Sequence, residues 1–206
     1  MIQIKYIDMS GIAGTKIVTD GLVLCLDAAN TKSYPGVRSN PVAGSWYDVT
    51  KGDTWLDTDC NGAFTEHSET NGFLFDGISE YFEQYQGFAT SYDTTTNIDG
   101  DVTAEAWFKI SALPASGYVR LFGRGQTNRL YGLWYSPTTF LYQRIQLGVS
   151  TMNCEYTSTP ELNKWYHMVG TSSGTSDHKL YLNGIQVQID ATSVSVPNVA
   201  GNVRYR

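Results

Sequence analysis

The stretch that decides the fold is Lys164–Val187, KWYHMVGTSSGTSDHKLYLNGIQV. Two runs in which apolar and polar residues alternate, a pattern typical of half-buried β-strands, flank a loop of Ser, Gly, Thr and Asp. The second run is interrupted by Asn183-Gly184, the dipeptide most typical of a two-residue hairpin turn. The segment therefore predicts a strand, a polar loop and a β-hairpin.

The same alternation recurs along the chain, without helical periodicity between the runs. Its longest instance is 102–110, VTAEAWFKI, which places Glu105 and Trp107 on one face and Phe108 on the other. Further strands are predicted at 2–6, 21–27, 73–75, 80–84, 118–125, 130–135, 141–149, 152–157, 164–171, 179–183 and 185–189. Because turn signals separate these short runs, we predict an all-β fold, a jelly-roll β-sandwich of two antiparallel sheets.

Size and charge limit the classes of function. The 206 residues suffice for one large all-β domain, and we expect an N-terminal arm or strand at 1–16 followed by a sandwich at 17–206. The net charge is −6 and there is no basic run, which argues against a nucleic-acid partner. The N-terminus lacks the apolar core of a signal peptide, and no run reaches the ~20 apolar residues of a membrane span, so no membrane partner is expected.

Cysteine usage does not indicate a disulfide-framed module. The chain has three cysteines, Cys25, Cys60 and Cys154, which cannot all pair internally. Cys25 lies inside the apolar run LVLCL, which predicts a buried thiol.

Several motifs, taken in order, resemble the concanavalin A-like lectin/glucanase superfamily and, within it, the laminin-G-like jelly-roll domain. They are GLVLCLDAANTKSYPG (21–36), SWYDVTKGD (45–53), FLFDGISEYFE (73–83), VTAEAWFKI (102–110), RLFGRG (120–125), NKWYHMVGT (163–171) and KLYLNGIQV (179–187). The resemblance covers about residues 17–203. The run at 18–36 is most similar to versions of this domain in structural proteins of tailed bacteriophages.

The resemblance implies a virion structural protein: a capsid decoration, fibre or tail-associated subunit, assembled in the host cytoplasm. Its expected partners are other virion proteins and further copies of itself, as a homo-oligomer. Because this fold also carries lectins and hydrolases, two alternatives remain: a carbohydrate-binding module without catalysis, recognising a host-surface glycan, and, third, a glycoside hydrolase.

Family members usually add a final strand beyond the point that corresponds to Arg206, so the sandwich is expected to lack that strand. Ile2, Ile4 and Tyr6 have the alternation to fill such a vacancy as a docking arm, in their own subunit or in a neighbour. The alternative is a leader without fixed structure.

Catalytic signatures are absent from the sequence. Glycosidases of this superfamily need two carboxylates flanking the scissile bond, which on one strand requires acids at every second position. Glu105 is alone on its strand, and the spacing of Glu80 and Glu83 would point them to opposite faces. His167 alternates with Trp165 and is expected to pack or hydrogen-bond on a sheet face, and no nucleophile elbow accompanies it. We expect no enzyme and no catalytic residue.

One local motif could hold calcium. Asp57, Asp59 and Asn61, followed by Gly62, match the first half of a D-x-D-x-N-G calcium loop. The twelfth position is Ser68 rather than Glu, and the alternative is an Asx-rich turn that forms without an ion. No other cofactor is expected.

Aromatic residues in loop-like contexts are the candidates for glycan or partner contact: Trp46, Tyr47, Trp55 and Tyr92. Such rings stack on sugars and also anchor protein interfaces, so the two interpretations remain open. Trp107 and Trp165 lie inside predicted strands and are predicted to belong to the core.

Overall fold

The computed structural model describes residues 2–4, 25, 27, 33, 66–68, 72–75, 101–126, 129–145, 151–173, 176–189 and 192–194. The chain forms two compact units, Met1–Gln84 and Tyr85–Arg206. The predicted boundary between 16 and 17 lies outside the described residues, and its assignment stays a prediction. Every regular element in these ranges is a strand; none is a helix with the length and apolarity of a membrane span.

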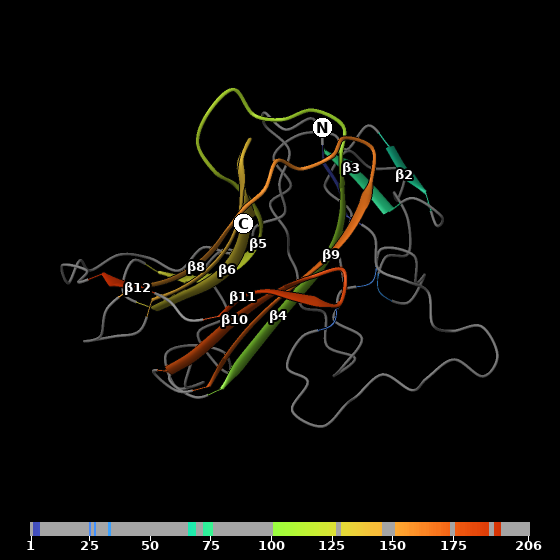
Figure 1. The fold of residues 1–206 in the computed structure, drawn as a ribbon. Coiled ribbons are helices and arrows are strands. Elements are labelled where there is room, and N and C mark those ends of the chain that lie inside the picture. The colour runs from blue at the N-terminus through green and yellow to red at the C-terminus, as the bar shows by residue number, and fades with distance from the viewer. Residues whose placement is uncertain are drawn as a thin grey trace. The chain divides into compact units, whose positions relative to one another are not determined.

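Four strands of the second unit form one antiparallel sheet, here called the four-stranded sheet. They are β4 (Val102–Ile110), β9 (Trp165–Ser173), β10 (Ser176–Leu182) and β11 (Ile185–Ile189), in the order β11-β10-β9-β4. Figure 1 shows β4, β9, β10 and β11 as one layer. The predicted strands 102–110 and 185–189 are confirmed to the residue.

Five strands form the opposing antiparallel layer, the five-stranded sheet. They are β5 (Val119–Gln126), β6 (Arg129–Tyr135), β7 (Thr139–Ile145), β8 (Thr151–Thr157) and β12 (Thr192–Val194), in the order β12-β8-β7-β6-β5. The predicted sandwich of two antiparallel sheets is therefore confirmed.

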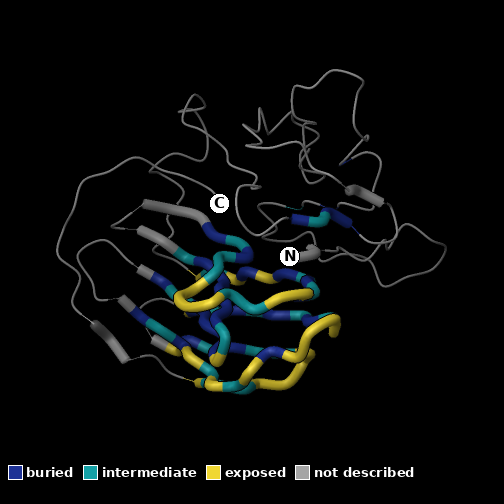
Figure 2. The backbone as a smooth tube through the Cα atoms, turned by 90° about the horizontal axis from the view of Figure 1, so that it is seen from above, coloured by how far each residue is buried: buried dark blue, intermediate teal, exposed yellow. Residues whose placement is uncertain are grey.

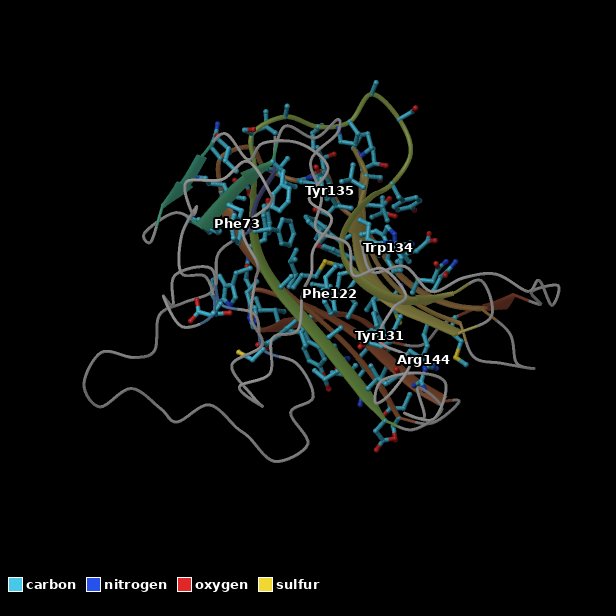
Figure 3. All side chains as sticks on the ribbon, turned by 180° about the vertical axis from the view of Figure 1, so that it is seen from behind. Phe73, Phe122, Tyr131, Trp134, Tyr135 and Arg144 are labelled. Atoms are coloured by element: carbon cyan, nitrogen blue, oxygen red, sulfur yellow. The ribbon has the colours of Figure 1, made fainter. Side chains whose placement is uncertain are left out.

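The core lies between the two sheets because each strand alternates. On β4, Ala104, Ala106, Phe108 and Ile110 are buried, while Thr103 and Glu105 are exposed. Figure 2 shows this change between buried and less buried residues along the strands. Phe108 meets the five-stranded sheet through the rings of Tyr135 and Phe140, with centroids 6.2 and 6.5 Å away. Tyr135 and Phe122 are labelled in Figure 3, where they lie in this interior.

A polar cluster also crosses the interior. Arg144 on β7 is fully buried, and its Nη1 donates a hydrogen bond to Ser172 Oγ on β9 at 2.8 Å. Tyr142 Oη lies 2.6 Å from the same Ser172 Oγ. Burial raises the pKa of Tyr142 to about 12, although the hydrogen bond with Ser172 opposes the shift. The two sheets are thus joined by directional polar contacts as well as by apolar packing.

The described residues of the first unit include three short strands in the order β1-β3-β2: β1 (Ile2–Ile4), β2 (Glu66–Ser68) and β3 (Gly72–Phe75). In β1, Ile2 pairs with Phe75 and Ile4 with Phe73 in antiparallel register. The predicted strand at the N-terminus therefore forms at Ile2 and Ile4 and pairs within its own chain. Tyr6 lies outside the described residues, and a docking role for this arm stays a prediction.

Two predictions for residues 21–27 are wrong at the positions that the structure describes. Cys25 and Asp27 do not belong to a strand. The backbone N–H of buried Asp27 donates to Ser33 Oγ at 3.0 Å, a local loop hydrogen bond in place of a strand ladder. Cys25 is half-buried rather than buried, whereas Cys154 on β8 is fully buried.

Candidate contact face

The Asn183-Gly184 turn fixes one end of the four-stranded sheet. Both residues have positive φ, 53° and 80°, as a two-residue hairpin of this type requires. Asn183 Oδ1 accepts a hydrogen bond from the His167 N–H at 2.9 Å, and the Asn183 N–H donates to the His167 carbonyl oxygen at 2.7 Å. The hairpin therefore holds β9 in place at His167.

Strand register then gathers aromatic and charged side chains on the face opposite the core. Trp107 of β4 stands opposite His167 of β9, and Lys109 stands opposite Trp165. Glu105 and, from β10, Tyr181 both stand opposite Val169. We call this set the contact row; its members are Glu105, Trp107, Lys109, Trp165, His167 and Tyr181.

Three members of the contact row touch one another. His167 Nε2 lies 3.5 Å from Glu105 Oε2. The imidazole also stacks on the Trp107 indole, with ring centroids 4.5 Å apart and planes 13° from parallel. The side chain of Glu105 is 56% exposed and that of His167 is 24% exposed. The hydrogen bond from His167 and, to a smaller extent, its charge hold the pKa of Glu105 below its ordinary value, against the opposing effect of partial burial.

The other end of the contact row pairs a cation with an indole. Lys109 Nζ lies 5.4 Å from the centroid of the Trp165 ring, within the range of a cation–π interaction. Both residues are half-buried.

The prediction that Trp107 and Trp165 belong to the core is wrong. Both are half-buried and stand on the outer face. Strand alternation already placed Trp107 with Glu105 and opposite Phe108, and this local signal outweighs the general tendency of tryptophan to be buried. The expectation that His167 packs or hydrogen-bonds on a sheet face is confirmed, since its ring stacks on Trp107.

The sites predicted in loops are not described by the structure. Trp46, Tyr47, Trp55 and Tyr92 lie outside the described ranges, as do the candidate calcium ligands Asp57, Asp59 and Asn61. Within those ranges no group of three or more His, Cys, Asp and Glu side chains is arranged to hold a metal ion. These residues stay predictions, and the contact row is a set that sequence reasoning did not assemble.

The contact row can make noncovalent contacts of several kinds. Its indole and phenol rings can stack or pack on a partner, its carboxylate can accept hydrogen bonds and its ammonium can donate them. The lowered pKa of Glu105 favours its ionised form, which accepts hydrogen bonds.

Comparison with known proteins agrees with this fold. The family model of the concanavalin A-like lectin/glucanases superfamily matches residues 82–205, a range that contains both sheets of the second unit. The chain therefore belongs to this superfamily. No curated protein and no solved structure matches it. The motifs at 21–36 and 45–53 lie before the matched range, so the likeness of 18–36 to bacteriophage structural proteins stays a resemblance.

Proposed function

We propose that this chain is a structural subunit of a tailed-bacteriophage particle whose sandwich domain holds other molecules without transforming them. The observation that carries the proposal is the contact row, an accessible set of aromatic and charged side chains displayed across β4, β9 and β10. The resemblance of residues 18–36 supports the assignment to a phage particle. The subunit would act as a capsid decoration, fibre or tail-associated protein.

The composition of the contact row suits protein and glycan contacts. Tyrosine and tryptophan are enriched among the residues that dominate binding energies, and a polar rim around them is typical of interfaces. Each such contact can be weak, because a particle presents many copies and the effective concentration of later contacts is high. A homo-oligomer would gain in the same way.

Electron microscopy of purified particles, labelled with an antibody against this chain, tests the assignment to a virion. The proposal expects label at one repeated position on the particle, and a native mass above that of one chain when the protein is purified alone. Particles without label, together with a monomeric mass at all concentrations, would contradict it.

A carbohydrate ligand is the second candidate function, and one observation favours it. The contact row carries a half-buried indole at each end, Trp107 beside the 56% exposed Glu105 carboxylate and Trp165 beside Lys109, which combines stacking surfaces with an acceptor for sugar hydroxyl groups. The test is binding to a glycan array by the wild-type chain and by Trp165→Ala. Binding that Trp165→Ala weakens at least about tenfold, or about 1.4 kcal/mol, supports this candidate. A blank array counts against it.

A further inference from the structure

The imidazole of His167 lies between a carboxylate and an indole. Its Nε2 is 3.5 Å from Glu105 Oε2, and its ring stacks on Trp107 at 4.5 Å. Its backbone N–H and carbonyl oxygen are both bonded to Asn183, which fixes the strand at this position. The ring is thus held beside both neighbours while 24% of its side chain remains accessible.

We propose that His167 makes the contact row proton-responsive, by binding the Glu105 carboxylate when the imidazole is protonated and leaving it available to a partner when the imidazole is neutral. Histidine is the side chain that ordinarily changes charge between about pH 5 and 8. The switch itself is a property of three side chains. Only its consequence for binding rests on the proposed function.

Both neighbours respond to the charge on the ring. A protonated imidazole attracts the Glu105 carboxylate and, lying over Trp107, converts a neutral stack into a cation–π interaction. A neutral imidazole can give the carboxylate at most one uncharged hydrogen bond. Acidification therefore holds Glu105 more tightly in the contact row, while neutral conditions leave its oxygens more open to hydrogen bonds from a partner.

Among the residues that the structure describes on this face, the lysines have partners of their own. From β4, Lys109 lies over Trp165. From β10, Lys179 Nζ is 2.9 Å from Asp177 Oδ2. Tyr181 of the same strand stands opposite Val169, as Glu105 does from β4, and adds a phenol group. Of the described carboxylates on this face, Glu105 is the one that contacts the imidazole. It is therefore expected to dominate the response of His167.

Tryptophan fluorescence as a function of pH tests the switch on the full chain without any ligand. A protonated imidazole quenches an adjacent indole, so the wild-type emission should fall in one transition as the pH drops through the histidine range. The transition should be lost in His167→Gln and in Trp107→Phe. In Glu105→Gln it should persist with a smaller amplitude, because the carboxylate that lies 3.5 Å from the ring and holds it beside Trp107 is gone.

Two outcomes would overturn the proposal: a transition of unchanged amplitude in His167→Gln, or an amplitude that Glu105→Gln does not change. If His167→Gln does not fold, NMR of the His167 ring protons in the wild type and in Glu105→Gln shows whether the response of the ring to pH depends on the carboxylate. Because no partner enters these measurements, their failure is separate from failure of the proposed function. Where a ligand binds, its affinity should weaken on acidification in the wild type and change less in Glu105→Gln.

Discussion

The aromatic ring of Tyr142 packs directly against the backbone of Gly170. A Cβ atom added at Gly170 would overlap Tyr142 Cδ2 and Cγ, far inside the separations that side chains adopt. Gly170 belongs to β9 and Tyr142 to β7, so this contact brings the two sheets together. Two residues further along β9, Ser172 lies 2.6 Å from Tyr142 Oη and orients the same ring.

Replacing Gly170 by alanine should therefore destabilise the sandwich. The ring cannot move away without losing its contact with Ser172, so the overpacking should cost about 1–3 kcal/mol or more. Denaturant unfolding followed by circular dichroism measures this change in the free energy of unfolding.

A double-mutant cycle identifies the contact responsible. In a Tyr142→Ala background the added methyl group meets no ring, so Gly170→Ala should cost much less than it does in the wild type. Equal costs in both backgrounds would show that the clash with Tyr142 is not the cause.

The Asn183-Gly184 turn contributes to stability in two ways, through its backbone conformation and through a side-chain hydrogen bond, and two variants separate them. Gly184→Ala forces a side chain into positive φ, where Gly184 has φ 80°, and should cost about 1–2 kcal/mol. Asn183→Gly keeps the turn conformation but removes the hydrogen bond to the His167 N–H, and should cost about 1 kcal/mol. If neither variant lowers the thermal midpoint, the turn does not fix the end of this sheet.

Alkaline pH should lower the free energy of unfolding of the domain by ionising Tyr142. The folded-state pKa of this phenol is raised to about 12, above the value of about 10 for an unfolded chain. Its contribution to stability is therefore fully present below pH 10 and is lost between about pH 10 and 12. Thermal unfolding across this range should show the loss, and Tyr142→Phe should reduce it. An unchanged pH dependence in Tyr142→Phe would assign the alkaline sensitivity to other groups, Tyr135 among them.

Acid should have a smaller effect through Glu105. Its folded-state pKa is lowered, so its contribution to stability is present above the ordinary glutamate value of about 4.3 and is lost as the pH falls through the folded-state value. The side chain is 56% exposed, and solvent screening limits the contribution to about 1 kcal/mol or less. Glu105→Gln should flatten the melting temperature between pH 5 and 3, and a steeper loss in that variant would contradict the assignment.

The sequence predicted the fold where local patterns decide it. The alternation of apolar and polar residues predicts the bounds of β4 and β11 correctly, and Asn183-Gly184 predicts the hairpin turn. Both signals lie in residues that are adjacent in the sequence, so they can be read without knowing the tertiary structure. The three-residue strands Glu66–Ser68 and Thr192–Val194 carry no detectable alternation, whereas Ile2–Ile4 does. The strand 141–149 was predicted to start too late: β7 begins at Thr139, where the Ser136 N–H binds the Thr139 carbonyl oxygen across a turn.

The candidate site was harder to predict because it is made by pairing between strands. Glu105 and His167 were each recognised as sheet-face residues, but their contact depends on the register between β4 and β9. No local sequence pattern predicts that register. The burial of Arg144 could not be predicted from the sequence either, because arginine in a strand is usually exposed to solvent.

The most direct test of the central claim compares binding of the chain to phage particles or to glycans after changes on two surfaces. One variant carries Lys109→Ala and Trp165→Ala in the contact row. The matched control carries Glu161→Ala and Lys164→Ala, which remove an exposed ion pair of 2.7 Å just before β9. Our account predicts that the first variant loses at least tenfold in affinity while the second binds as the wild type does. Equal binding by all three proteins would contradict it.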